Sequence, residues 1–415
     1  MSQLLIEGGY PLCGVVGIQG AKNSVLPILS AALLSDGECV VKNFPDITDT
    51  DAAIDILRAL GAKVIRRDDC ISVNAENADG YEIPDCLMRK MRSSIMFLGA
   101  ILSRSKKAVV SLPGGCELGR RPIDIHLSAL KKMGVFINEN HGFLECFHNG
   151  LSGAEINLSF PSVGATENIM LAAVKAEGTT EIHNAAREPE IEDLAAFLCK
   201  MGAKIKGAGT DRIIIRGVKK LDGCEHSVLP DRIVAATYLC AVAATKGNAL
   251  IKNVNPNHLC TVTSLLSEAG CSVSVYDDAI SVECEKLSAL PMIRTMPYPG
   301  FPTDAQAPFM ALASVARGNT LFVETIFENR FKHVDELVRM GAKITTEGRV
   351  ALVEGVKKLH SASVQATDLR GGAGLVIAGL SAEGKTVISS AEHIFRGYEK
   401  LEENLTELGG RIKKL

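Results

Sequence analysis

The chain has 415 residues, of which 47% are hydrophobic and 22% are charged, a balance typical of a folded protein with more than one domain. Its formal net charge of -3 excludes the broad basic field of a general nucleic-acid or membrane-surface binder, so any anion site must be local. The sequence opens with no basic segment followed by an apolar core, and no apolar run approaches the roughly 18 residues of a membrane span. We therefore expect a cytoplasmic protein that is not embedded in a membrane.

The twelve cysteines and nine histidines show no pattern of a disulfide framework or a metal site. The closest two cysteines, Cys260 and Cys271, are eleven residues apart, so there is no CxxC pair, and no histidines have HExxH spacing. We expect free thiols, no metal and no cofactor.

In chain order, the first twenty residues end on a strand-like stretch at 15–18, and six similar units follow. In each unit a helix ends at a glycine that suits a left-handed cap, and residues that favour a strand come next. A unit reads helix, strand, helix, strand, with a further strand such as 212–216. The six glycines are 68 to 73 residues apart: Gly61, Gly134, Gly202, Gly270, Gly341 and Gly409.

Six units of about 70 residues fit two α/β domains of three units each. We expect an N-terminal domain of residues 21–229 and a C-terminal domain of residues 230–415 that is completed by residues 1–20. The chain then crosses between the domains twice, near residues 20 and 230, which predicts a hinge.

An apolar helix is expected to begin in each unit, near Lys22, Arg92, Ser162, Asp231, Asp304 and Asp368, and in five of the six units a polar or charged residue stands at its start. For any single Asp or Ser, an ordinary N-cap is the simplest interpretation. Equivalent helices should gather their N-termini at one face, however, where helix dipoles attract anions. Six basic residues add to that charge, although each arginine alone reads more simply as a solvated surface charge: Lys22, Arg92, Arg121, Arg330, Arg370 and Arg396.

The segment 112–122 is predicted to be a loop, because it holds three glycines and two prolines. It also carries two arginines and Cys116. A thiol in such a loop should be accessible, whereas the other cysteines lie mostly in apolar strands or helices, where a cysteine is usually a small buried hydrophobe. We therefore assign chemistry to Cys116 rather than packing.

Together these residues resemble the UDP-N-acetylglucosamine 1-carboxyvinyltransferases, enolpyruvyl transferases of peptidoglycan synthesis, over essentially the whole chain. The resemblance implies two inside-out α/β barrels, each of three pseudo-symmetric units, that close on their substrates. The motifs that carry it are Gly20-Ala21-Lys22-Asn23, Met91-Arg92-Ser93-Ser94, Pro113-Gly114-Gly115-Cys116, Arg121-Pro122-Ile123-Asp124, Ser162-Val163-Gly164-Ala165-Thr166, Ala186-Arg187-Glu188-Pro189-Glu190, Pro302-Thr303-Asp304, Phe327-Glu328-Asn329-Arg330 and Thr367-Asp368-Leu369-Arg370.

The resemblance implies transfer of the enolpyruvyl group of phosphoenolpyruvate to the 3-hydroxyl of UDP-N-acetylglucosamine, with release of phosphate. It implies that Cys116 donates a proton to phosphoenolpyruvate and that Asp304 is the base on the sugar hydroxyl. Lys22, Arg121 and Arg396 are then the clamp on the phosphate and carboxylate of phosphoenolpyruvate.

The resemblance also implies a UDP-sugar site in which backbone N–H groups at a helix start receive diphosphate oxygens. Asp368 and Arg370 are implied to orient the catalytic groups, and Arg330 to contact substrate. Some family members carry a lysine for the diphosphate where this chain has Phe160, and Arg120 is the candidate to replace it. The UDP-sugar residues are Asn23, Arg92, Arg121, Pro122, Ile123, Asp124, Ile125, Ser162, Val163, Gly164, Asp304 and Ile326.

Two alternatives remain open. An enolpyruvyl transferase that acts on shikimate 3-phosphate would share the architecture and the anion clamp, but the loop with Cys116 and the Arg121-Pro122 segment favour the UDP-sugar. A non-catalytic relative that binds UDP-sugar is disfavoured, because Lys22, Cys116, Asp304 and Arg396 are all retained.

Overall fold

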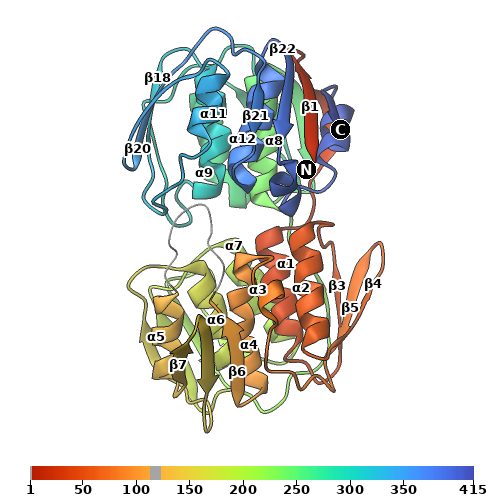
Figure 1. Cartoon of the computed structure of the whole chain (residues 1–415), viewed down its shortest axis with the longest axis vertical. Helices are drawn as coiled ribbons and strands as arrows, with labels where there is room; N and C mark the ends of the chain where they lie inside the picture. Colours follow the sequence, from red (N-terminus) through yellow and green to blue (C-terminus); the bar gives the residue numbers. More distant parts are fainter. Residues whose placement is uncertain (1, 113–122) are drawn as a thin grey trace. The chain divides into compact units, whose positions relative to one another are not determined.

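The computed structural model describes residues 2–112 and 123–415 and divides into two compact units (Figure 1). Of the described residues, the first unit holds 20–112 and 123–229, and the second combines 2–19 with 230–415. No helix in the described part of the chain is both long and apolar enough to cross a membrane.

The first unit alternates helices with short strands. Its helices and its 3-10 segment are α1 (Lys22–Ala32), α2 (Thr48–Ala59), α3 (Asp85–Met88), η1 (Arg92–Met96), α4 (Phe97–Arg104), α5 (Asp124–Lys132), α6 (Val163–Ala173) and α7 (Pro189–Lys200). Its strands are β3 (Glu38–Lys42), β4 (Lys63–Arg66), β5 (Cys70–Asn74), β6 (Lys107–Ser111), β7 (Phe136–Asn140), β8 (Phe143–Phe147), β9 (Glu155–Asn157), β10 (Thr179–His183), β11 (Lys204–Lys206), β12 (Arg212–Arg216) and β13 (Glu225–Ser227).

Three separate sheets form in the described part of this unit, with strand orders β13-β3-β5-β4, β6-β8-β7 and β11-β12-β10-β9. Each four-stranded sheet combines one parallel pair with antiparallel pairs, as β9 and β12 do on either side of β10. The three-stranded sheet β6-β8-β7 has a matching parallel bridge from Glu82 to Val109 of β6. The same small motif is therefore built three times.

The second unit likewise alternates helices with short strands. Its helices and 3-10 segments are α8 (Arg232–Ala244), η2 (Pro256–Leu259), α9 (Cys260–Glu268), η3 (Thr303–Ala305), α10 (Gln306–Ser314), α11 (Val334–Arg339), α12 (Leu369–Ser381), η4 (Ala391–Arg396) and α13 (Leu401–Glu407). Its strands are β1 (Gln3–Gly8), β2 (Cys13–Gly17), β14 (Asn248–Lys252), β15 (Ser272–Val275), β16 (Ala279–Glu283), β17 (Met292–Arg294), β18 (Asn319–Val323), β19 (Lys343–Glu347), β20 (Val350–Glu354), β21 (Ser363–Gln365), β22 (Gly384–Ser389) and β23 (Arg411–Lys414).

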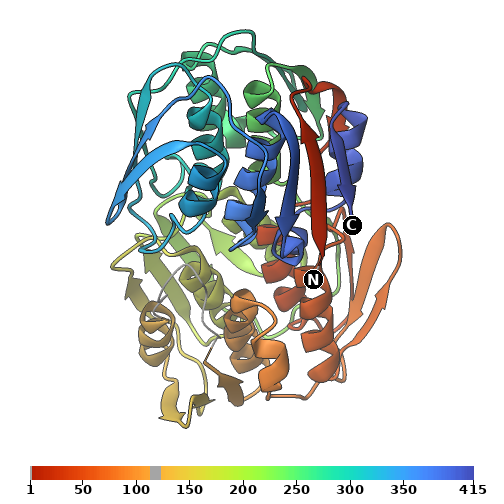
Figure 2. The same cartoon turned by 45° about the horizontal axis from the view of Figure 1, so that its top comes forward.

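The two N-terminal strands belong to sheets of the second unit. Its sheets have the orders β21-β22-β1-β23, β15-β16-β14-β2 and β17-β18-β20-β19. Figure 2 shows β1, in red, beside the blue strands of the C-terminal part, because β1 pairs antiparallel with both β22 and β23. Strand β2 pairs in parallel with β14 in the same way. Strands β1 and β2 thus complete two four-stranded sheets whose other strands come from the C-terminal part of the chain.

The glycine pattern that defines the repeats is confirmed. Each glycine follows a helix and adopts a positive φ, as at Gly61 (φ 93°) and Gly202 (φ 105°). A Cβ atom is strained in this left-handed region, so glycine is the residue that ends these helices most easily. The other four, Gly134, Gly270, Gly341 and Gly409, have the same conformation.

One helix of each repeat is buried on nearly all sides. Five of the six helix starts predicted from the sequence are confirmed within two residues, whereas at Arg92 the short η1 begins and the buried helix α4 follows only from Phe97. In the second unit α8, α10 and α12 pack against one another, and every residue of α8 and α10 is buried. These helices are apolar all round, as expected of helices inside a core. The charged residues of these three helices, Arg232 and Arg370, lie in the first turn, which concentrates charge at the N-termini.

Candidate active site

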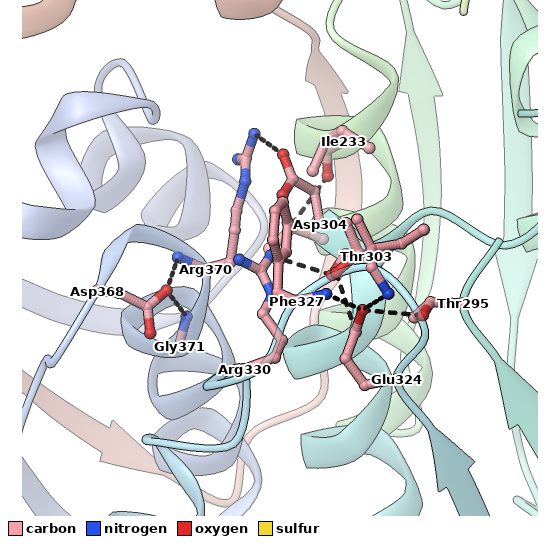
Figure 3. Close-up of polar contacts among 12 residues, drawn as sticks. Ile233, Thr295, Thr303, Asp304, Glu324, Phe327, Arg330, Asp368, Arg370 and Gly371 are labelled. Atoms are coloured by element: carbon pink, nitrogen blue, oxygen red, sulfur yellow. Dashed lines mark hydrogen bonds and ion pairs between the residues drawn. The ribbon is translucent and has the colours of Figure 1, made fainter. Parts of the chain in front are cut away.

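Asp304 lies in η3, directly before α10, and its carboxylate is held by two guanidinium groups (Figure 3). Arg330 Nη2 donates to Asp304 Oδ1 at 2.9 Å, and Arg370 Nη2 donates to Oδ2 at 3.4 Å. The Asp304 side chain keeps 26% of its surface exposed, whereas both arginine side chains keep 3%. Two buried cations fix this carboxylate, and part of it remains exposed. Such a carboxylate is suited to accept a proton from a substrate hydroxyl.

The N-cap interpretation of the polar helix starts is correct for Ser162, Asp231 and Asp368 and wrong for Asp304. The first three side chains accept hydrogen bonds from backbone N–H groups of α6, α8 and α12. Asp304 is not at the N-cap position of either helix there, since Pro302 precedes η3 and Ala305 precedes α10, and its carboxylate contacts Arg330.

The surface-charge interpretation is also wrong for Arg330 and Arg370, which are 3% and 2% exposed. Burial works to lower the pKa of Arg370, but Tyr398 and Asp304 together raise it above its ordinary value. The guanidinium lies over the Tyr398 ring, 5.3 Å from its centroid. Its Nε and Nη1 atoms are buried and have no hydrogen-bond partner within the described residues.

Glu324 is a site residue that sequence reasoning missed. It directly follows β18, is 2% exposed, and accepts hydrogen bonds from Thr295, Thr303, Ile326 and Phe327 (Figure 3). Its side chain thereby joins the neighbour of Asp304 to the expected UDP-sugar residue Ile326. The only signal in the sequence was its place at the end of a strand.

His333 was missed as well. It precedes α11, is fully buried, and lies in the electrostatic range of Asp368 and Arg330. Burial lowers the pKa of His333 to about 4, and Arg330 acts in the same direction although Asp368 opposes it. The imidazole is therefore neutral at pH 7. Arg396, the remaining predicted residue of this unit, is half-buried at the end of η4, which packs against α12.

In the first unit, Lys22 is the first residue of α1 and its ammonium is paired with Asp49 in the first turn of α2. The Nζ to Oδ2 distance is 2.7 Å, and the two side chains are 11% and 3% exposed. A buried ion pair of this kind fixes the lysine at the helix start, where an anion would also meet the positive end of the dipole.

A second buried network adjoins Lys22. Asp193 of α7 accepts from Ser24 Oγ in the first turn of α1, from His226 Nε2 at 2.8 Å and from Leu229 N at 3.2 Å. The order is serine, aspartate, histidine, so the imidazole does not contact the hydroxyl and the trio is no serine nucleophile of the Ser-His-Asp type. Its effect is to tie the start of α1 to the segment at Leu229.

The remaining predicted residues of this unit lie at helix starts. Asn23 is in the first turn of α1, Val163 and Gly164 begin α6 after the Ser162 cap, and Arg92 begins η1. Asp124 and Ile125 begin α5 after Ile123, and α5 packs against α6.

A further missed residue, His126, explains the close contact of α5 with α6. Its ring lies so near Gly164 that a Cβ there would be 3.2 Å from His126 Cε1, and its Nδ1 is 2.9 Å from Asn168 Nδ2.

Three predicted residues, Cys116, Arg121 and Pro122, lie outside the described residues. Accessibility by itself does not single out one thiol, because four of the described cysteines are exposed: Cys13, Cys86, Cys199 and Cys260. Six of the described cysteines are buried, as expected. Within the described residues, no group of three or more His, Cys, Asp or Glu side chains is placed to hold a metal ion.

Comparison with known proteins identifies the family. The chain is 52% identical to UDP-N-acetylglucosamine 1-carboxyvinyltransferase 2 of Caldanaerobacter subterraneus subsp. tengcongensis, over 100% of both chains. It is 48% identical to UDP-N-acetylglucosamine 1-carboxyvinyltransferase of Thermotoga maritima, over 100% of this chain and 99% of the other. The chain belongs to the UDP-N-acetylglucosamine 1-carboxyvinyltransferase family. The resemblance inferred from the motifs is confirmed.

Broader comparisons place this carboxyvinyltransferase family in its fold. A family model described as EPSP synthase (3-phosphoshikimate 1-carboxyvinyltransferase) matches residues 6–405. The enolpyruvyl transferase NikO from Streptomyces tendae superimposes with a TM-score of 0.89 at 26% identity, covering 100% of this chain and 99% of that one. EPSP synthase from Acinetobacter baumannii gives 0.78 at 19% identity over the whole of both chains, which shows a shared fold alone. The α/β enolpyruvyl transferase fold is thus established.

Phe160 is the position at which the sequence was expected to depart from some members of the family. Phe160 is 39% exposed, and its carbonyl accepts a hydrogen bond from Ser162 N at 2.7 Å just before α6. An exposed ring beside the expected diphosphate position offers no charge.

Proposed function

We propose that this protein transfers the enolpyruvyl group of phosphoenolpyruvate to the 3-hydroxyl of UDP-N-acetylglucosamine and releases phosphate, the first committed step of peptidoglycan synthesis. The observation that carries the proposal is Asp304, a partly exposed carboxylate fixed between Arg330 and Arg370 at the start of a buried helix. The full-length identity of about half to carboxyvinyltransferases of this specificity supports it. Because both substrates are charged phosphate compounds of metabolism, we also propose a cytoplasmic location.

The proposed mechanism is an addition followed by an elimination. Cys116 protonates the methylene carbon of phosphoenolpyruvate, and the adjacent carbon gains cationic character. The sugar 3-hydroxyl loses its proton to Asp304 and attacks that carbon to give a tetrahedral adduct. Loss of a proton from the new methyl group and departure of phosphate then restore the vinyl group.

The binding roles divide between the units. We propose that Lys22, Arg121 and Arg396 hold the phosphate and carboxylate of phosphoenolpyruvate, where fixed cations offset the charge that develops.

The UDP-sugar contacts are proposed mainly at helix starts. The starts of α1, α5, α6 and η1 carry most of them, and Ile326 adds a contact from the second unit. The proposed residues are Asn23, Arg92, Arg121, Pro122, Ile123, Asp124, Ile125, Ser162, Val163, Gly164, Asp304 and Ile326.

We also propose that each unit is an inside-out α/β barrel and an independent domain. The buried helices α8, α10 and α12 in mutual contact, with three small sheets in the same unit, support this arrangement.

The deciding experiment is a phosphate-release assay on the purified protein. Release should require both phosphoenolpyruvate and UDP-N-acetylglucosamine, and the Asp304→Asn variant should fold but turn over at least about a hundredfold more slowly. Turnover with shikimate 3-phosphate in place of the UDP-sugar would contradict the proposed specificity. Binding of UDP-N-acetylglucosamine without phosphate release would point to a non-catalytic relative.

A further inference from the structure

Glu324 and Thr295 lie side by side at the ends of two parallel strands. Strand β17 pairs with β18 in parallel, with Arg294 opposite Val323, so the next residue of each strand is Thr295 and Glu324. In α/β proteins the carboxyl ends of parallel strands are where functional groups gather. The two side chains are 1% and 2% exposed, so neither is positioned to meet solvent.

The Glu324 carboxylate is fully engaged (Figure 3). Its Oε1 accepts from Thr295 Oγ1 at 3.0 Å, from Ile326 N at 2.8 Å and from Phe327 N at 3.0 Å. Its Oε2 accepts from Thr303 Oγ1 at 3.0 Å. Four donors offset the cost of burying a carboxylate and leave no vacant position for a substrate proton, so Glu324 is not itself a second base.

These bonds close a ring around Asp304. Thr303 is the residue before Asp304, and Ile326 and Phe327 open the segment that leads to Arg330. Arg330 Nη2 returns to the start of the ring, since it donates both to Thr303 O at 3.0 Å and to Asp304 Oδ1 at 2.9 Å. Glu324 thus holds the segment with the carboxylate and the segment with its guanidinium partner in one arrangement.

We propose that Glu324 is a positioning residue that sets the place of the Asp304 carboxylate and of the Ile326 backbone for the reaction. This inference rests on the proposed function, because it takes Asp304 as the base on the sugar hydroxyl. A buried apolar side chain would fill the same volume without the desolvation cost of a charge. What a carboxylate adds is the directed contact with four donors on two segments.

Two variants at Thr303 test the branch nearest to Asp304 without removing the buried charge. Thr303→Val replaces the hydroxyl by a methyl group of similar size and should lower kcat about tenfold, because a small displacement of a catalytic group has a large kinetic effect. The affinities for phosphoenolpyruvate and UDP-N-acetylglucosamine should stay within about twofold. Thr303→Ser keeps the donor and should restore kcat to within about twofold of wild type.

Thr320 supplies the matched control. It is a buried threonine of β18 in the same sheet, and its hydroxyl has no hydrogen-bond partner within the described residues. Thr320→Val therefore removes a buried hydroxyl that makes none of these contacts, and kcat should not change.

Glu324→Ala removes the whole network and should lower kcat by about a hundredfold. It should also weaken the binding of UDP-N-acetylglucosamine, because the Ile326 backbone is no longer held.

The outcomes separate the two proposals. A folded Thr303→Val protein with wild-type kcat, or a Thr303→Ser protein as slow as Thr303→Val, would overturn the role of Glu324. So would an equal loss of kcat in Thr320→Val. If wild-type protein releases no phosphate with both substrates, the proposed function fails instead, and the variants need not be compared.

Discussion

Three buried cations in this protein are paired with carboxylates. Lys22 is paired with Asp49 in the first unit, and Arg330 and Arg370 are paired with Asp304 in the second. Removing one partner of a buried pair is far more destabilising than removing an exposed one, because a charge is left without compensation. The pairs therefore hold these three cations in fixed positions.

The pair of Lys22 and Asp49 gives the first prediction. Asp49→Asn should lower the free energy of unfolding by about 3 kcal/mol, because the Lys22 ammonium is left buried beside a neutral amide. Phosphoenolpyruvate should raise the melting temperature of this variant more than that of wild type, since its charge can replace the lost carboxylate.

Asp51→Asn is the control for Asp49→Asn, because Asp51 lies in the same helix but pairs with Arg66 at the surface, where its side chain is 55% exposed. Urea and thermal unfolding of both variants measure the difference. Equal free energies of unfolding of the two variants would show that the buried pair stabilises the protein no more than the exposed pair does.

His333 gives a prediction about pH. Its pKa is about 4 in the folded protein against 6.5 for an ordinary imidazole, chiefly because of burial. As the pH falls between these values, the unfolded chain binds a proton that the folded chain does not, so the free energy of unfolding decreases by roughly 3 kcal/mol. The charges of Asp368 and Arg330 act on the ring in opposite directions: Asp368 raises the pKa of His333 and Arg330 lowers it.

The pH effect is measured by comparing denaturant unfolding of wild type and His333→Leu from pH 7 to pH 4. The variant should lose less stability over this range. His360→Leu is the control, because His360 is exposed. The free energy of unfolding of this variant should fall with pH as steeply as that of wild type. Parallel slopes for His333→Leu and wild type would refute the prediction.

The thiols give a prediction about selectivity. The epoxide fosfomycin, a small phosphonate that resembles phosphoenolpyruvate, should alkylate Cys116 ahead of the other eleven cysteines. Because Cys13, Cys86, Cys199 and Cys260 are also exposed, selectivity must come from an anion site that binds the phosphonate. A neutral alkylating reagent should therefore label the exposed thiols too. Peptide mass mapping that finds fosfomycin spread over them would contradict the prediction.

At the scale of elements, the buried helices were predictable because their sequences are apolar on all sides and their starts carry cap residues. Asp231 and Asp368 illustrate this, since each bonds the N–H groups of its own helix. Local sequence could not show that Asp304 departs from this rule. Its partners, Arg330 and Arg370, come from 26 and 66 residues further along the chain.

Asp193 connects three elements, and its removal is the prediction at this scale. Asp193→Ala leaves Ser24, His226 and Leu229 without their acceptor and should lower the free energy of unfolding by about 3 kcal/mol. Since Lys22 is in the same first turn as Ser24, kcat/KM for phosphoenolpyruvate should also fall, by about tenfold.

Asp222→Ala is the matched control for Asp193→Ala, because Asp222 pairs with Lys220 at the surface. Urea unfolding and steady-state kinetics on both proteins provide the comparison. If Asp193→Ala behaves like Asp222→Ala, the network does not position α1.

For the whole molecule, the chain passes between the two units near residues 20 and 230. Backbone bonds hold each passage within its own unit, from Ala21 N to Leu229 O and from Asp231 N to Gln19 O. Because the proposed substrate groups are divided between the units, we predict that UDP-N-acetylglucosamine closes one unit on the other. Small-angle X-ray scattering should show a smaller radius of gyration with UDP-N-acetylglucosamine than with UDP alone, and an unchanged radius would exclude closure.

The sequence by itself determined the repeats, because their signals are local. A glycine is needed where a helix ends in the left-handed region, and Gly61 or Gly202 shows this within a few residues. The run Ile213-Ile214-Ile215 is likewise enough to place β12. Motifs along the whole chain were also sufficient to identify the family.

Only the tertiary structure decided which charges are buried and what each one contacts. Arg330 and Arg370 look like surface residues in the sequence, and Glu324 and His333 carry no motif of their own. Their roles depend on distances of about 3 Å between segments far apart in the chain, and on burial that no local pattern reports. Electrostatic energy and hydrogen bonding depend on such distances, whereas helix ends and strand preference depend on neighbours in sequence.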